Sequence, residues 1–97
     1  MATFITLINY TRDGAQNMKD APDRLADARR LAESMGGSID QWYLTMGQYD
    51  AVVIGSAPDD EAIAKVLLAV GATGRVRTQT MRAFTEDEFA GLIDSMP

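Results

Sequence analysis

The spacing of apolar residues along the chain predicts four strands and three helices. Strands are indicated where β-branched and aromatic residues cluster, at residues 3–10, 39–46, 49–56 and 74–84. Helices are indicated where apolar residues recur every three or four positions, at residues 20–35, 59–70 and 85–96. Residues 11–19 are polar and are expected to form a loop or an irregular helical turn. The order is therefore β-α-β-β-α-β followed by one more helix.

This order favours one sheet topology. Helical crossovers join parallel strands, a short hairpin joins antiparallel neighbours, and the usual result is a ferredoxin-like α+β fold with the antiparallel sheet order 4-1-3-2. Strands one and three are apolar on both faces, which suits central strands. The fourth strand is polar, with Arg75, Arg77 and Arg82, which suits an edge.

Local residues predict how the elements begin and end. Gly47-Gln48 suits a two-residue hairpin turn of type II′ between the second and third strands. Thr85, with Glu88 three residues later, predicts a capping box at the start of the last helix. The apolar positions of that helix are expected to dock it onto the domain: Phe89, Leu92, Ile93 and Met96.

Two helices can cover only one face of the sheet, yet its central strands are apolar on both. Soluble monomers rarely expose a large apolar patch, so we expect a second copy to pack sheet against sheet as a dimer or higher oligomer. The alternatives are that the C-terminal helix covers the open face or that the exposed apolar patch is modest.

The composition of the chain excludes several kinds of catalytic and metal-binding chemistry. Ninety-seven residues make one domain, residues 1–97. The chain has neither cysteine nor histidine, which excludes thiol nucleophiles, thiolate zinc and imidazole bases, and we expect no cofactor and no metal. The net charge of -5 argues against binding of nucleic acid. Without a long apolar segment or a signal-peptide pattern, no membrane association is expected and the protein is predicted to be cytoplasmic.

Several ordered motifs resemble the GYD family of small, mainly bacterial domains, named for a Gly-x-Tyr-Asp signature. The residues that carry the resemblance are Asn9-Tyr10-Thr11, Gly14, Lys19, Pro22, Arg24, Tyr43 to Asp50, Ala57 to Asp60, Gly74 to Thr80 and Arg82 to Thr85. The resemblance spans nearly the whole chain and implies a ferredoxin-like fold related to the dimeric α/β-barrel proteins. It brings no catalytic residues with it.

The first candidate site is the carboxylate of Asp50, which follows a polar turn and opens an apolar strand. It could be a partly buried acid or base, with Tyr49 or Arg82 as an oxyanion partner. The competing and preferred interpretation is structural: Asp50 accepts backbone hydrogen bonds, or pairs with Arg77 or Arg82. Strand alternation points Tyr49 to the face opposite Asp50.

Weaker candidates for ligand contact lie near the first strand and on the sheet: Asn9, Thr11, Arg12, Thr45, Thr78 and Thr80. Asn9, Thr11 and Arg12, at the end of the first strand, also suit turns and caps. The threonines at positions 45, 78 and 80 could line the open face, or could be present only because threonine favours strands. Arg75 and Arg77 are expected to share a face opposite Arg82, so no single anion-binding patch is predicted.

Three functions remain open. The first is an oligomeric module without catalytic activity that binds a small molecule at or near the open sheet face. The second is a cofactor-free enzyme of the dimeric α/β-barrel type, such as an oxygenase, isomerase or decarboxylase acting on a small aromatic or oxo-acid. The third is a structural or regulatory assembly partner.

Overall fold

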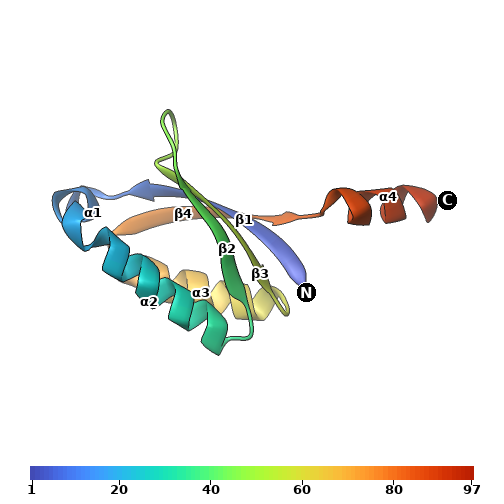
Figure 1. Ribbon diagram of the computed structural model, residues 1–97, viewed down its shortest axis with the longest axis horizontal. Helices are drawn as coiled ribbons and strands as arrows, with labels where there is room; N and C mark the ends of the chain where they lie inside the picture. The colour runs from blue at the N-terminus through green and yellow to red at the C-terminus, as the bar shows by residue number, and fades with distance from the viewer.

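The computed structural model describes all residues, 1–97 (Figure 1). Its elements, in chain order, are β1 (Ala2–Tyr10), α1 (Arg12–Gln16), the 3-10 helix η1 (Met18–Asp20), α2 (Ala21–Ser34), β2 (Ser38–Leu44), β3 (Ala51–Ala57), α3 (Asp60–Ala72), β4 (Val76–Ala83) and α4 (Glu86–Asp94). The expected order of elements is confirmed, including the irregular helical segment after the first strand.

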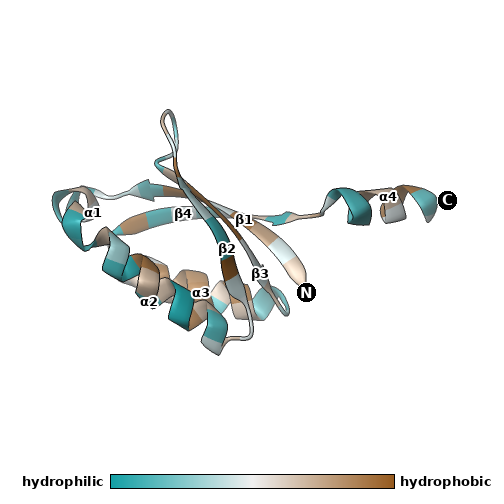
Figure 2. Ribbon diagram, viewed as in Figure 1, coloured by the Kyte–Doolittle hydropathy of each residue, from teal (hydrophilic) through white to brown (hydrophobic).

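The four strands form one sheet in the order β2-β3-β1-β4, with every neighbouring pair antiparallel. This is the predicted ferredoxin-like topology. The two most apolar strands, β1 and β3, are the central pair, and the polar β4 lies at an edge. Figure 2 shows the apolar stretches of β1 and β3 in the middle of the sheet.

Both crossover helices, α2 and α3, lie on one face of the sheet (Figure 1). Each begins where its sequence dictates. Pro22 stands in the first turn of α2, and the side chain of Asp59 caps α3 by accepting a 2.9 Å hydrogen bond from the N–H of Ala62. The fully buried cluster between sheet and helices is small and consists of Phe4, Ala57 and Ala62.

Two predictions about the chain's path are wrong. The β2–β3 connection is not a two-residue turn, because the last pair of the ladder is Leu44 with Ala51 and the N–H of Thr45 donates to the carbonyl of Asp50 at 2.9 Å. Residues 46–49 therefore form a four-residue loop. Helix α4 does have its capping box on Thr85 and Glu88, but it extends away from the rest of the chain (Figure 1).

The expected docking residues of α4 are correspondingly exposed. Phe89 is 57% exposed and Ile93 49%, so α4 covers neither face of its own sheet. The face opposite α2 and α3 stays open. By strand alternation its apolar residues are Ile5, Leu7, Tyr43, Val52, Ile54 and Met81.

Candidate functional site

The Gly-x-Tyr-Asp motif lies in the four-residue loop 46–49 and in Asp50, which closes this loop together with Thr45. The hydroxyl of Thr45 donates to the carbonyl of Tyr49 at 2.7 Å. Gly47 has a φ of 109°, a conformation that side-chain-bearing residues rarely adopt, so the glycine of the motif is a requirement of the backbone. The hydroxyl of Thr45 therefore stabilises the loop by this hydrogen bond.

Asp50 ties this loop to the end of β1. Its carboxylate Oδ2 accepts a hydrogen bond from the N–H of Tyr10 at 2.8 Å, and its own N–H donates to the carbonyl of Ile8 at 2.8 Å. Asp50 forms no ion pair with Arg77 or Arg82. The structural interpretation of Asp50, as an acceptor for backbone N–H groups, therefore agrees with its contacts.

Tyr49 extends from the loop over the open face of the sheet. Its hydroxyl donates to Oε1 of Gln79 on β4 at 3.0 Å, across the intervening β1. Together with Leu7, Asn9 and Arg77 it borders a depression of about 240 Å³. Of the weak candidates, Asn9 and Thr78 border this depression with Tyr49.

Arg82 lies far from Asp50. It pairs in register with Phe4, whereas Asp50 contacts Tyr10, six residues along the same strand and therefore roughly 20 Å away. The guanidinium of Arg82 lies 4.4 Å from the ring centroid of Phe84 and 4.0 Å from the carboxylate of Glu88. The structure does not assemble Asp50, Tyr49 and Arg82 into one site.

The other weak candidates are dispersed. Thr78 and Thr80 pair with Ile8 and Thr6, which line the helix side of the sheet, so the side chains of these threonines point to that side and not to the open face as expected. The hydroxyl of Thr80 bonds that of Thr6 at 2.8 Å. Arg12 is exposed at the start of α1.

A cavity with a volume of about 640 Å³ lies between the helices and the sheet. Volumes of this size are typical of sites for small molecules. Its walls are mainly apolar side chains from α2, α3 and all four strands, among them Ile8, Leu25, Trp42, Val53 and Leu67. It is on the opposite side of the sheet from the face that the sequence favoured.

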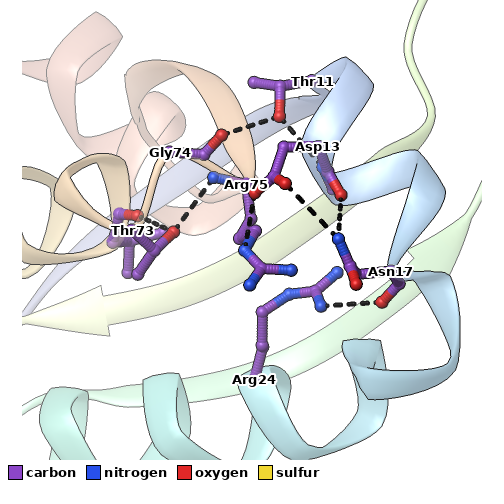
Figure 3. Close-up of polar contacts among 9 residues, drawn as sticks. Thr11, Asp13, Asn17, Arg24, Thr73, Gly74 and Arg75 are labelled. Atoms are coloured by element: carbon purple, nitrogen blue, oxygen red, sulfur yellow. Dashed lines mark hydrogen bonds and ion pairs between the residues drawn. The ribbon is translucent and has the colours of Figure 1, made fainter.

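Two arginines stand at one end of this cavity, and each has an unpaired nitrogen. Arg24 of α2 donates from Nη1 to the carbonyl of Asn17 at 3.0 Å, and Nε of Arg75 lies 2.9 Å from Oδ2 of Asp13. Nη2 of Arg24 and Nη1 of Arg75 are buried without a hydrogen-bond partner. Figure 3 shows the two guanidinium groups pointing toward one another.

Helix α1 holds this end of the cavity in place. Thr11 caps α1 by accepting from the N–H of Gly14 at 3.1 Å, and its hydroxyl donates to the carbonyl of Gly74 at 2.7 Å (Figure 3). The N–H of Thr11 donates to the carbonyl of Arg75 at 3.0 Å. The expected capping role of Thr11 thus has a consequence for the site, because it brings Asp13 to Arg75.

The arginine pair was not predicted as a site. Arg75 and Arg77 were expected to share a face, but Arg75 precedes β4 and lines the helix-side cavity, while Arg77 borders the open-face depression. A sequence signal for Arg24 existed: it stands four residues before Ala28 and seven before Leu31, within the apolar stripe of α2. A charged residue on a buried stripe is an unusual choice.

The family model for the GYD domain matches residues 4–93. This chain belongs to the GYD domain family. The GYD domain is 32% identical over 84 residues to the glutamine synthetase and cystathionine beta-lyase binding protein of Thermus thermophilus, covering 86% of this chain and 88% of that protein.

Solved structures share the fold. A feast or famine regulatory protein of M. tuberculosis, complexed with L-methionine, superposes with a TM-score of 0.66 at 18% identity over 88% of this chain. The GYD domain spans about half of that regulator, 51% of its chain. A protein of known structure from Thermus thermophilus superposes with a TM-score of 0.56 at 22% identity, covering 88% of this chain and 95% of its own. These similarities establish the ferredoxin-like fold.

No three acidic, histidine or cysteine side chains gather as a group that could hold a metal ion. No helix is both long enough and apolar enough to cross a bilayer.

Proposed function

We propose that this GYD domain is a self-associating module without catalytic activity that binds a small molecule in the cavity between its helices and its sheet. The observation that carries the proposal is the apolar cavity of about 640 Å³. Protein interiors are normally close-packed, so a space of this size is suited to a ligand. The carboxylate of Asp50 already accepts a hydrogen bond from the backbone N–H of Tyr10, and this structural role favours ligand binding over an enzyme that uses Asp50 as its acid or base.

Self-association is the second part of the proposal. The open face carries paired apolar residues, with Ile5 opposite Ile54 and Leu7 opposite Val52, on the two central strands. A second copy that packs its own open face there removes both patches from water at once. The assembly we propose is therefore a dimer through the sheets, with each ligand cavity on the outer, helix-covered side.

Another possible function, binding of a partner protein, is favoured by one observation. The Thermus thermophilus relative is named as a binding protein for two enzymes. In this chain the exposed apolar side of α4, with Phe89, Leu92 and Ile93, offers a surface for such a partner. We rank this function below ligand binding because α4 is equally suited to contact a second copy of the domain.

Ligand binding is tested with the only tryptophan, Trp42, which lines the cavity. A metabolite library is screened for compounds that raise the melting temperature, and each hit is then titrated while the fluorescence of Trp42 is followed. Compounds that do both support the proposal. A library in which no compound changes either measurement contradicts it.

Self-association is tested by light scattering of two variants. Ile54→Lys places a charge in the centre of the open face and is expected to yield monomers. Leu68→Lys, on α3, makes the same change at a side chain that is 74% exposed, and is expected to leave the oligomer intact. Dissociation by Leu68→Lys alone would mean that the copies meet through α3 and not through the sheet.

A further inference from the structure

The charges at the end of the helix-side cavity are unbalanced. Arg24 and Arg75 contribute two positive charges, and Asp13, which pairs with Arg75, contributes one negative charge. The one acidic residue of the cavity lining itself, Asp27, is paired with Arg30 on the exposed side of α2. One positive charge is therefore left without a counter-charge at the end of a cavity whose walls are mainly apolar.

The two unpaired nitrogens show where this positive charge is available to a ligand. Nη2 of Arg24 and Nη1 of Arg75 are both buried, each lacks an acceptor, and the two guanidinium groups face one another (Figure 3). A buried N–H of a charged group without a partner is unfavourable, whereas a carboxylate has two oxygens that can accept from both. Other nitrogens of the pair are already held by Asn17 and Asp13, so the guanidinium groups are fixed in position before any ligand arrives.

From this the geometry points to a carboxylate-bearing apolar molecule as the ligand: its carboxylate bridges Arg24 and Arg75, and its apolar body fills the cavity beside Leu25, Trp42 and Leu67. This inference rests on the proposed function and adds the chemical class of the ligand. A single negative charge matches the single uncompensated positive charge. An amino acid fits less well, because its ammonium group would need an acidic partner and both nearby aspartates are already paired.

Matched ligands separate the carboxylate from the rest of the molecule. The full chain is titrated with octanoate and 4-phenylbutanoate and with the corresponding neutral amides, by isothermal calorimetry and by the fluorescence of Trp42. The acids are expected to bind at least about tenfold more tightly than their amides, because only they accept charge-assisted hydrogen bonds from both arginines. L-methionine also has the carboxylate, but its ammonium group would lack a free acidic partner, so it is expected to bind less tightly than 4-(methylthio)butanoate, which has no ammonium group.

Matched variants separate the arginine pair from other positive charges. Arg24→Gln and Arg75→Gln are each expected to weaken binding of the acids about tenfold or more. Neither is expected to change binding of the amides, which a collapse of the cavity would weaken too. Lys65→Gln, at an exposed position of α3, and Arg77→Gln, on the opposite face of the sheet from Arg75, serve as controls and are expected to leave acid binding unchanged.

The outcomes distinguish this inference from the proposed function. Equal binding of acids and amides, or equal effects of the control variants, would overturn the carboxylate assignment while leaving the cavity as a binding site. Loss of acid and amide binding together in Arg24→Gln and Arg75→Gln would mean that the arginines only support the cavity, which also overturns it. If no probe and no library compound changes the Trp42 fluorescence or the melting temperature, both the inference and the proposed function fail.

Discussion

The backbone of Gly14 lies against that of Arg75 so closely that a β-carbon added at Gly14 would fall 1.9 Å from the Arg75 carbonyl oxygen. The same carbonyl accepts the hydrogen bond from the N–H of Thr11. This contact fixes α1 on the turn before β4 and thereby sets Asp13 beside Arg75. The shape of the cavity's charged end thus depends on a glycine that has no polar side chain of its own.

Gly14→Ala is therefore expected to destabilise the fold by about 1–3 kcal/mol, since backbone must move to admit the methyl group. The free energy of unfolding is measured by urea titration. Gly91→Ala is the matched control, because nothing lies within 4 Å of a β-carbon there and alanine favours the helical conformation of α4. A Gly14→Ala protein as stable as the parent would contradict the close contact.

Asp50→Ala is expected to lower the free energy of unfolding by about 1–3 kcal/mol, because the part-buried N–H of Tyr10 loses its acceptor. Asp50→Asn keeps an acceptor oxygen, so its effect is expected to be smaller. Hydrogen exchange of the Tyr10 amide gives a local readout and is expected to speed up in Asp50→Ala. Asp94→Ala, at the exposed end of α4, is the control. Unchanged exchange at Tyr10 in Asp50→Ala would show that this carboxylate does not secure the loop.

The fold could be predicted from the sequence because the strands differ so clearly in polarity. Two strands that are apolar on both faces have to be central, and a polar strand has to be at the edge, which leaves one topology. The helix starts at Asp59 and Thr85 were equally predictable, since capping depends on residues within one turn. These features depend on local pattern alone.

The site could not be predicted in the same way. Alternation along β4 gives the face of Arg77 correctly, but Arg75 stands before the first strand residue, where alternation does not apply. Its direction depends on Asp13, which is distant in the chain and reaches it only through the packing of α1. The prediction of a two-residue turn at Gly47 was wrong for a related reason. The loop is longer than two residues because Asp50 bonds β1, a contact that the hairpin sequence does not encode.

The lowered pKa of Glu88 predicts that the stability of helix α4 depends on pH. The backbone N–H of Thr85 donates to its carboxylate at 2.9 Å, and this bond, with the Thr85 side chain and the charge of Arg82, lowers the pKa of Glu88. A carboxyl with a lowered pKa in the folded state stabilises that state at pH values above its unfolded pKa. The stabilisation is lost as the pH falls through the lowered value.

Helix α4 is therefore expected to fray in acid, beginning below roughly pH 4.3, the ordinary pKa of glutamate. The amide proton of Thr85, followed by NMR, is expected to titrate with the Glu88 carboxylate, while amides of α2 and α3 do not follow the same curve. Glu88→Gln retains a capping side chain and is expected to abolish this titration. A Thr85 amide that still titrates in Glu88→Gln would mean that another carboxyl is responsible.

The apolar side of α4 gives the final prediction. Phe89 and Ile93 lie four residues apart on this helix and are each about half exposed, with α4 extended from the domain. The double variant Phe89→Ser/Ile93→Ser is expected to change the stability of the isolated domain by less than about 0.5 kcal/mol, since exposed side chains contribute little.

If α4 contacts a second copy, Phe89→Ser/Ile93→Ser is also expected to weaken the oligomer. Light scattering over a dilution series would then show that the variant dissociates at a higher protein concentration than the parent. Ala90→Ser/Asp94→Ser, on the same helix, is the control and is expected to leave both measurements unchanged. A loss of several kcal/mol in the isolated domain would instead mean that α4 packs against its own sheet, because removing a packed phenylalanine costs about 3–5 kcal/mol.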